Sequence, residues 1–294
     1  MLTGLVTDVG RKLAERWAAA LVLPGLVFTA VAATALTLGQ RHWADLGLLR
    51  ERLRELTAGG PGAGSTRTAV LLLGVLAASF AAALLAEALA GPYERVLQGS
   101  WPRPLHPLAR RLTERRRRAW DSHDAACVAA LHTGTAAERE AERNAVALVR
   151  PECPTWTGDR LRAPATRIRL HYRIELADAW PRLWLLLPDT TRLPLAESRQ
   201  RLDEAMRLGG WAVLYVLLGA VWWPAAVAGA GAGLVAWRRG RERAEEYAEL
   251  VESAVDVHLP ELFERFDDEA HPVRASLGRT VTERFRKGAG ARRR

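Results

Sequence analysis

Three long stretches of the chain carry almost no charge, and their lengths predict membrane-spanning helices. The first, residues 17–38, is uncharged throughout, and the second, residues 69–90, holds Glu87 as its only charge. A helix of either length would extend about 33 Å, close to the hydrocarbon thickness of a bilayer. A cleaved signal peptide is the alternative for the first stretch, although the apolar core of such a peptide usually has only about 7 to 15 residues.

The third uncharged stretch, residues 208–237, has a different length and a different pattern. A single helix over it would extend about 45 Å, which is long for one crossing and short for two. Trp222, Trp223 and Pro224 lie at its middle, where an aromatic belt and a helix break coincide. We therefore expect a tight helical hairpin, with a re-entrant hairpin as the alternative. Three glycines in its second arm would allow close helix packing: Gly229, Gly231 and Gly233.

The distribution of arginine predicts the orientation of these spans. The residues that follow the second stretch are rich in arginine and poor in acids, as cytoplasmic segments are. An even number of spans then places both termini in the cytoplasm. The expected fold is all-α: a polytopic protein of the cell (inner) membrane with two transmembrane helical hairpins, a helical cytoplasmic middle region and a C-terminal helix.

We expect five regions along the chain. They are an N-terminal amphipathic helix with the first transmembrane hairpin (1–90), the cytoplasmic helical region (91–205), the second transmembrane hairpin (206–238), a cytoplasmic helix (239–269) and a basic disordered tail (270–294).

Shorter helices are predicted from apolar periodicity. Leucines at helical spacing in residues 46–56 predict an amphipathic helix between the first two spans, and Gly91 with Pro92 predicts the end of the second span. An apolar stripe over residues 105–131 predicts one cytoplasmic helix. Thr135 and Glu138 have capping-box spacing for a second helix that reaches about Arg150 and pairs with it in antiparallel fashion.

Two further segments have apolar patterns of different period. Residues 167–176 alternate between polar and apolar as a strand does, but no second strand is evident, so we expect irregular or helical structure. An apolar stripe after the third stretch predicts a helix that packs on the middle region. We expect Pro260 to restart this helix. The stripe comprises Tyr247, Val251, Val255, Leu259, Leu262 and Phe266.

One segment resembles a known family. Trp180-Pro181-Arg182-Leu183 and Leu187-Pro188, followed by an amphipathic stretch that enters the hairpin, are similar to an uncharacterised family of bacterial four-span membrane proteins. The resemblance continues through Tyr247, Ala248, Glu249, Leu250 and Asp256 and covers residues 180–262. It implies two hairpins of spans around a cytoplasmic middle region, and it implies no activity.

Charge and composition suggest partners. The formal charge is +9, which would suit nucleic acid or anionic lipid, and the uncharged spans favour lipid headgroups. The run Arg115, Arg116, Arg117 and Arg118 is the candidate headgroup contact, Glu87 is a candidate intramembrane acid, and the candidate interface anchors are Trp17, Trp222, Trp223 and Trp237. Only two cysteines are present, which indicates a reducing compartment.

The sequence contains no pattern that indicates catalysis. His123, Cys127 and His132 are the one cluster that we considered as metal ligands, but His132 falls on another helical face, and we expect neither a metal nor a cofactor. Phosphate-binding loops, nucleophile elbows and zinc-protease motifs are absent from the sequence. We therefore expect a protein that is not an enzyme.

Two hypotheses about function remain. In the first, the chain is a membrane scaffold or sensor whose cytoplasmic helices bind a partner, which is either a second copy of this chain or a cytoplasmic protein. In the second, it is an oligomeric channel or a membrane-perturbing, pore-forming effector, as short spans rich in glycine and alanine would allow. A carrier would need more spans and a polar site at mid-membrane.

Overall fold

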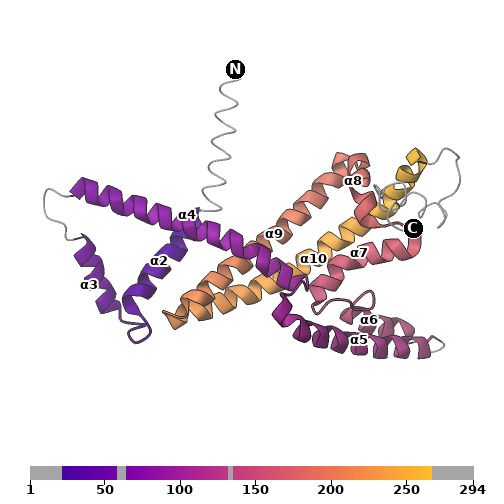
Figure 1. The fold of residues 1–294 in the computed structure, drawn as a ribbon, viewed down its shortest axis with the longest axis horizontal. Coiled ribbons are helices and arrows are strands. Elements are labelled where there is room, and N and C mark those ends of the chain that lie inside the picture. The colour runs from indigo at the N-terminus through magenta and orange to yellow at the C-terminus, as the bar shows by residue number, and fades with distance from the viewer. Residues whose placement is uncertain (1–21, 58–63, 132–134, 267–294) are drawn as a thin grey trace, which may run out of the picture. The chain divides into compact units, whose positions relative to one another are not determined.

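A computed structural model describes residues 22–57, 64–131 and 135–266. All regular secondary structure in these residues is helical, which confirms the all-α prediction. The elements labelled in Figure 1 are α2 (Leu23–Leu38), α3 (Leu46–Thr57), α4 (Gly64–Leu97), α5 (His106–Ala129), α6 (Ala136–Val146), α7 (Trp156–Tyr172), α8 (Leu176–Leu186), α9 (Asp189–Leu218) and α10 (Trp223–Phe266). A short 3₁₀ helix, η2 (Arg103–Leu105), precedes α5.

The chain divides into two compact units. Unit 1 comprises Met1–Tyr93 and Met206–Trp237, and unit 2 comprises Glu94–Ala205 and Arg238–Arg294. Helices α4, α9 and α10 contribute residues to both units. By length and composition, the part of α4 from Arg67 to Leu97 is the one described helix that could cross a membrane alone, while α2 is apolar but shorter. The predicted four spans and five regions stay predictions.

Small side chains build the interior of unit 1. The buried residues of α4 recur at helical spacing and are all small: Ser79, Ala82, Ala83, Ala86 and Ala90. A Cβ at Gly25 of α2 would overlap the backbone of Ser79, and a Cβ at Gly210 of α9 would overlap that of Ala86. The Ser79 hydroxyl also donates to Thr29 Oγ1 of α2 at 3.2 Å. These helices therefore pack backbone against backbone.

The second half of unit 1 is a helical hairpin, as predicted for residues 208–237. Helix α9 ends at Leu218 and α10 begins at Trp223, so the break falls at the predicted position. A Cβ at Gly229 would lie 2.6 Å from the Val216 nitrogen, which confirms close packing there. Gly233 makes ordinary contact with Ala212, whereas Gly231 faces open space and does not help the arms to approach.

The loop after α2 contacts the turn of this hairpin. Gln40 Nε2 donates to the carbonyl oxygens of Gly219 and Ala220 at 2.9 and 3.0 Å, and its Oε1 accepts from the Trp223 amide at 3.1 Å. Trp222 Nε1 donates to the Trp43 carbonyl at 3.1 Å. One side chain thus satisfies backbone groups on both sides of the hairpin turn, where helix ends leave them without partners.

Two prolines do not interrupt their helices, contrary to prediction. Helix α4 continues through Gly91 and Pro92 to Leu97, and α10 continues through Pro260. A proline within a helix removes one backbone hydrogen bond, and contacts further along the helix can offset that loss. After Pro92, Glu94 accepts from Arg199 of α9 at 2.8 Å, and α4 ends only where Gly99 adopts a φ of 81°. The Ser100 amide there bonds to the Arg95 carbonyl and the Gly99 amide to that of Val96, which is the Schellman arrangement.

The alternating segment, residues 167–176, is helical through Tyr172, so the alternative of helical structure is confirmed. Arg173 then takes a left-handed conformation with φ 57° and ends α7, and α8 begins at Leu176. Ile168 and Ile174 are buried, but Leu170 is exposed, so the alternation does not mark one buried face. With no strand beside it in the described residues, this segment satisfies its backbone within helices.

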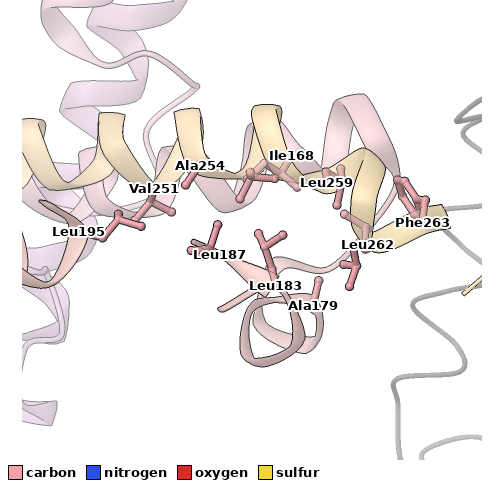
Figure 2. Close-up of a cluster of buried hydrophobic side chains, with 12 residues drawn as sticks. Ile168, Ala179, Leu183, Leu187, Leu195, Val251, Ala254, Leu259, Leu262 and Phe263 are labelled. Carbon is pink, nitrogen blue, oxygen red and sulfur yellow. The ribbon is translucent and has the colours of Figure 1, made fainter. Parts of the chain in front are cut away.

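Large apolar side chains form the core of unit 2 (Figure 2). Figure 2 shows side chains of α10 and α7 pointing toward those of α8 and of the start of α9. The cluster comprises Ile168, Ile174, Ala179, Leu183, Leu187, Leu195, Val251, Ala254, Val255, Leu259, Leu262 and Phe263. The predicted packing of the C-terminal helix on the middle region is therefore confirmed.

Two glycine substitutions test whether α4 continues through Gly91 and ends at Gly99. We expect Gly99→Ala to destabilise the protein by about 2 kcal/mol, because alanine disfavours the left-handed conformation and its Cβ would lie 2.8 Å from Pro154 Cδ. Gly91→Ala is the matched control: Gly91 lies inside α4 with nothing within 4 Å of an added Cβ, so we expect about 0.5 kcal/mol of stabilisation. Thermal unfolding in detergent measures both changes. A loss of stability in Gly91→Ala would contradict the continuous helix.

Candidate functional site

A groove on unit 2 is a candidate binding site. It consists of two adjoining hollows of about 340 and 600 Å³, which share Trp180, Pro181 and Tyr247. The first is lined mainly by apolar residues of α7, α8 and α10. The second extends along α9 and includes Arg199, Gln200 and Asp203.

Helix α8 places the aromatic residues of the groove. Its residues Ala179, Leu183 and Leu187 face the core, so the neighbouring positions 180, 181 and 184 lie at the edge of that buried face. The rings of Trp180 and Trp184 are 5.9 Å apart, and both side chains are half-buried. The core contacts of α8 therefore fix a pair of indole rings at the surface.

Some of the residues on which the predicted family resemblance rests line this groove. Leu183 and Leu187 are core residues, and Pro188 ends α8, because the residue before a proline favours an extended conformation, as Leu187 shows with ψ 131°. Trp180 and Pro181 line the groove together with Tyr247 and Ala248 of α10, which are far away in sequence. Sequence analysis singled out these residues but did not place them on one surface.

The positive charge of Arg199, at the polar end of the groove, is compensated by acids. Arg199 Nη2 lies 2.8 Å from both Glu94 Oε1 and Asp203 Oδ1, and its guanidinium is 5.9 Å from the Tyr247 ring. Burial opposes the charge on Arg199, but its hydrogen bonds and ion pairs with Glu94 and Asp203 outweigh that effect and raise its pKa. Because this cation has two acids beside it, the groove suits an apolar or neutral ligand better than a charged one.

The predicted headgroup run separates into two pairs. Arg115 and Arg118 are exposed on α5. Arg116 instead donates from Nη2 to Asp159 Oδ2 at 2.8 Å and to the Val146 carbonyl at 3.0 Å, and Arg117 donates to the Pro151 carbonyl at 2.8 Å. The bond from Arg116 to Val146 and the ion pair of Arg143 with Asp124 join α5 to α6 in antiparallel order, which confirms the predicted pair, although α6 ends at Val146 rather than near Arg150.

Helix α5 exposes part of its predicted apolar stripe. Leu105, Leu108 and Leu131 are exposed, while Thr113 and Cys127 are buried. The buried face therefore differs from the expected one, because Arg116, Arg117 and Trp120 occupy the contact with α6 and the following loop. Long arginine side chains can lie along a helix contact and bond to carbonyls that apolar side chains would leave unsatisfied.

The other predicted site residues fall in different places. Glu87 is exposed on α4 and has no hydrogen-bond or ion-pair partner in the described part of the chain. Trp223 packs edge-on against Trp43 at 5.0 Å, beside Trp222 at the hairpin turn. Trp237 is 41% exposed. Trp17 lies outside the described residues.

The residues considered for metal binding show no metal-site geometry. His123 Nδ1 lies 3.7 Å from Glu142 Oε2, Cys127 is buried, and His132 lies outside the described residues. No group of three metal-ligating side chains occurs within the described ranges. The other cysteine, Cys153, is also buried, and burial raises the pKa of its thiol to about 11. Its thiol is thus protonated at neutral pH, so it is a poor nucleophile.

No protein-family model, curated protein sequence or solved structure is significantly similar to this chain. The resemblance over residues 180–262 therefore stays a prediction.

Proposed function

We propose that the chain is an integral membrane scaffold or sensor without enzymatic activity, in which unit 1 lies in the bilayer and unit 2 binds a partner in the cytoplasm. One observation carries this proposal: most large apolar side chains of unit 1 are at least partly exposed, whereas those of unit 2 form a buried core.

Unit 1 has the distribution of a lipid-facing structure. Its buried residues are mostly alanine, glycine and serine, whereas most of its large apolar side chains are at least partly exposed. On α4 large apolar side chains are exposed over most of the apolar stretch, among them Leu72, Leu76, Phe80 and Leu84. In water such a surface would be costly, and in hydrocarbon it would not be.

Unit 2 has the distribution of a water-soluble domain. The largest side chains that are almost fully buried all belong to it, and they include Ile168, Leu183 and Leu259. Its surface carries many ion pairs, such as Arg150 with Asp121 and Arg201 with Glu246. The hydrophobic effect would assemble this core in water.

The contacts within unit 1 support one orientation. The loop after α2 and the hairpin turn bond to each other through Gln40 and Trp222, so both belong to one end of unit 1. The positive-inside rule places the arginine-rich residues after α4 in the cytoplasm. The loop and the turn would then face the opposite side, with Trp43 and Trp223 at the interface.

Cysteine labelling tests this topology. In a chain with Cys127 and Cys153 replaced by alanine, we expect a membrane-impermeant maleimide to label His42→Cys in intact spheroplasts. Arg118→Cys should react only after lysis, because the bilayer would protect it. Both positions are exposed in the structure, so both must react in lysed cells. Labelling of Arg118→Cys in intact cells, or extraction of the protein by alkaline carbonate, would contradict the proposal.

The groove is the surface on unit 2 at which we place the partner. It is lined chiefly by apolar residues, it exposes two indole rings, and its one arginine is paired with acids. Aromatic side chains at the surface contribute strongly to protein interfaces. We therefore expect a protein segment with an apolar face as the ligand.

A photocrosslinking amino acid at Gln200, which is exposed at the groove, tests this site. We expect a specific adduct in intact cells, reduced at least about tenfold by Ala177→Arg, because an unpaired guanidinium in the groove would oppose an apolar ligand. Ala125→Arg is the matched control, since Ala125 is also exposed but lies on α5, outside the lining of the groove. An adduct that is unchanged by Ala177→Arg would exclude the groove.

The channel hypothesis has one observation in its favour. Glu87 belongs to the exposed side of α4, one turn beyond Leu84, and it has no partner among the described residues. A carboxylate facing lipid is costly, so a second copy of the chain could cover it and line a cation path.

Flux from liposomes that contain the purified protein distinguishes the two functions. If the chain is a channel, we expect cation flux that falls at least about tenfold in Glu87→Gln, because the path loses its negative charge. Glu94→Gln is the control, since Glu94 is paired with Arg199. The absence of flux from the wild-type protein would leave the scaffold as the function.

A further inference from the structure

One face of α5 carries three arginines, Arg111, Arg115 and Arg118, which we call the arginine stripe. They follow one another by four and three residues, so they lie on the same side of the helix. All three are exposed. None of them forms an ion pair or a hydrogen bond with another residue in the described part of the chain.

The opposite face of α5 is held within unit 2. Arg116 donates to Asp159 Oδ2 at 2.8 Å, and Trp120 Nε1 donates to the Ala147 carbonyl at 2.9 Å. Positions 116 and 120 lie one turn apart, on the far side of the helix from the stripe. These contacts fix the rotation of α5 about its axis, and the stripe therefore faces away from the rest of unit 2.

The acids of α5 do not balance the stripe. Asp121 pairs with Arg150 and Asp124 pairs with Arg143, each at a distance of 3.0 Å or less. Glu114 is the one acid of α5 that is not engaged in such a pair. Like charges three or four residues apart destabilise a helix in water. An anionic partner along this face would remove that repulsion.

Exposed leucines adjoin the stripe on its N-terminal side. Leu108 precedes Arg111 by one turn and is 48% exposed, and Leu105 is 43% exposed. Leu105 also follows the last residue of α4, Leu97, by only eight positions, which extended chain spans in at most about 28 Å. A basic helix with apolar side chains beside it, tethered to a helix that could cross a membrane, has the composition of an interfacial helix.

We propose that α5 lies along an anionic bilayer surface, with the arginine stripe on the headgroup phosphates and the two leucines at the boundary of the acyl chains. Arginine suits this role, because its planar guanidinium donates several hydrogen bonds to phosphate oxygens. The face differs from the run predicted to contact headgroups: Arg111 belongs to it, whereas Arg116 and Arg117 do not. The proposal rests on the proposed membrane location of unit 1.

The charge of the stripe sets the size of the expected effect. Near an anionic surface, each arginine raises the ratio of docked to undocked α5 about fivefold, so three raise it roughly 100-fold. At 1 M salt the screening length falls to about 3 Å. Most of the gain should therefore disappear at high salt.

Fluorescence quenching in nanodiscs tests the contact. In the full chain with Cys127 and Cys153 replaced by alanine, a fluorophore is attached at Ser122→Cys, which is exposed one turn beyond Arg118. We expect a lipid with a spin-labelled headgroup to quench it more strongly when phosphatidylglycerol is added to phosphatidylcholine. Ala137→Cys, exposed on α6, is the matched control and should show no dependence on phosphatidylglycerol.

Substitution of the stripe separates its charge from its position near the membrane. With Arg111, Arg115 and Arg118 all changed to glutamine, we expect the ratio of docked to undocked α5 to fall at least about tenfold. The matched control changes three exposed arginines elsewhere in unit 2 to glutamine, and it should behave as the wild type does: Arg162, Arg169 and Arg265. Since every changed side chain is exposed, we expect both triple variants to keep the wild-type Tm in detergent.

Two results would overturn the contact. One is quenching at residue 122 that does not respond to phosphatidylglycerol, and the other is an equal response in the wild type and in the stripe variant. If the detergent-purified protein instead bound duplex DNA through the stripe and ignored the lipid, the partner would be a nucleic acid and the lipid assignment would be wrong.

A second fluorophore position distinguishes this failure from failure of the membrane proposal. Leu76 is exposed on α4, so a fluorophore at Leu76→Cys should be quenched by a lipid that is spin-labelled on its acyl chain, with or without phosphatidylglycerol. Absence of that quenching would contradict the membrane location. Quenching at residue 76, combined with no response at residue 122, would overturn only the contact of α5 with the bilayer.

Discussion

The close approach of helix backbones in unit 1 determines where its large side chains lie. At Gly25 and Gly210 a neighbouring backbone occupies the space that a Cβ would need, and at Gly229 the facing backbone is within 3 Å of that position. Because small residues occupy most of the interior of unit 1, most of its leucines and valines are left on the outer surface, with Leu38 and Leu214 as exceptions. Such a surface is stable only in an apolar solvent or under a partner. Unit 2 has the opposite distribution, with a core of large side chains and most of its arginines at the surface.

Packing between helices also explains why one predicted helix end was correct and another was wrong. The hairpin break at Pro224 was predictable, because a proline there coincides with an uncharged stretch that is too long for one crossing. Gly91 and Pro92 carried a similar local signal, yet α4 continues past them. The difference is tertiary: Glu94 binds Arg199 of α9 beyond the proline, and the helix ends at Gly99, where Pro154 and the left-handed conformation leave room only for glycine. Sequence shows where a helix can end, and packing selects among those places.

The arginines show that the sequence also could not identify which charged residues are exposed and which are buried. Composition identified an excess of positive charge, and periodicity placed the run 115–118 on one helix. Neither could show that Arg115 and Arg118 face solvent while Arg116 joins α5 to Asp159. Arg160 received no attention in the sequence, because a single arginine in an arginine-rich chain carries no signal. Only the structure shows that its side chain is buried, with Glu245 as its ion-pair partner. The groove could not be predicted from the sequence either, since its residues come from four helices, α7 to α10.

By itself, the sequence determined the helical class, the three uncharged stretches, the antiparallel pair of helices α5 and α6, and the apolar stripe of the C-terminal helix, because these follow from spacing along the chain. Only the tertiary structure decided that small residues fill unit 1, that Trp180 and Tyr247 share a groove, and which arginines are buried. Such features depend on which faces of distant helices meet. That choice is set by the steric fit of backbones and side chains over the whole fold, and no local pattern encodes it.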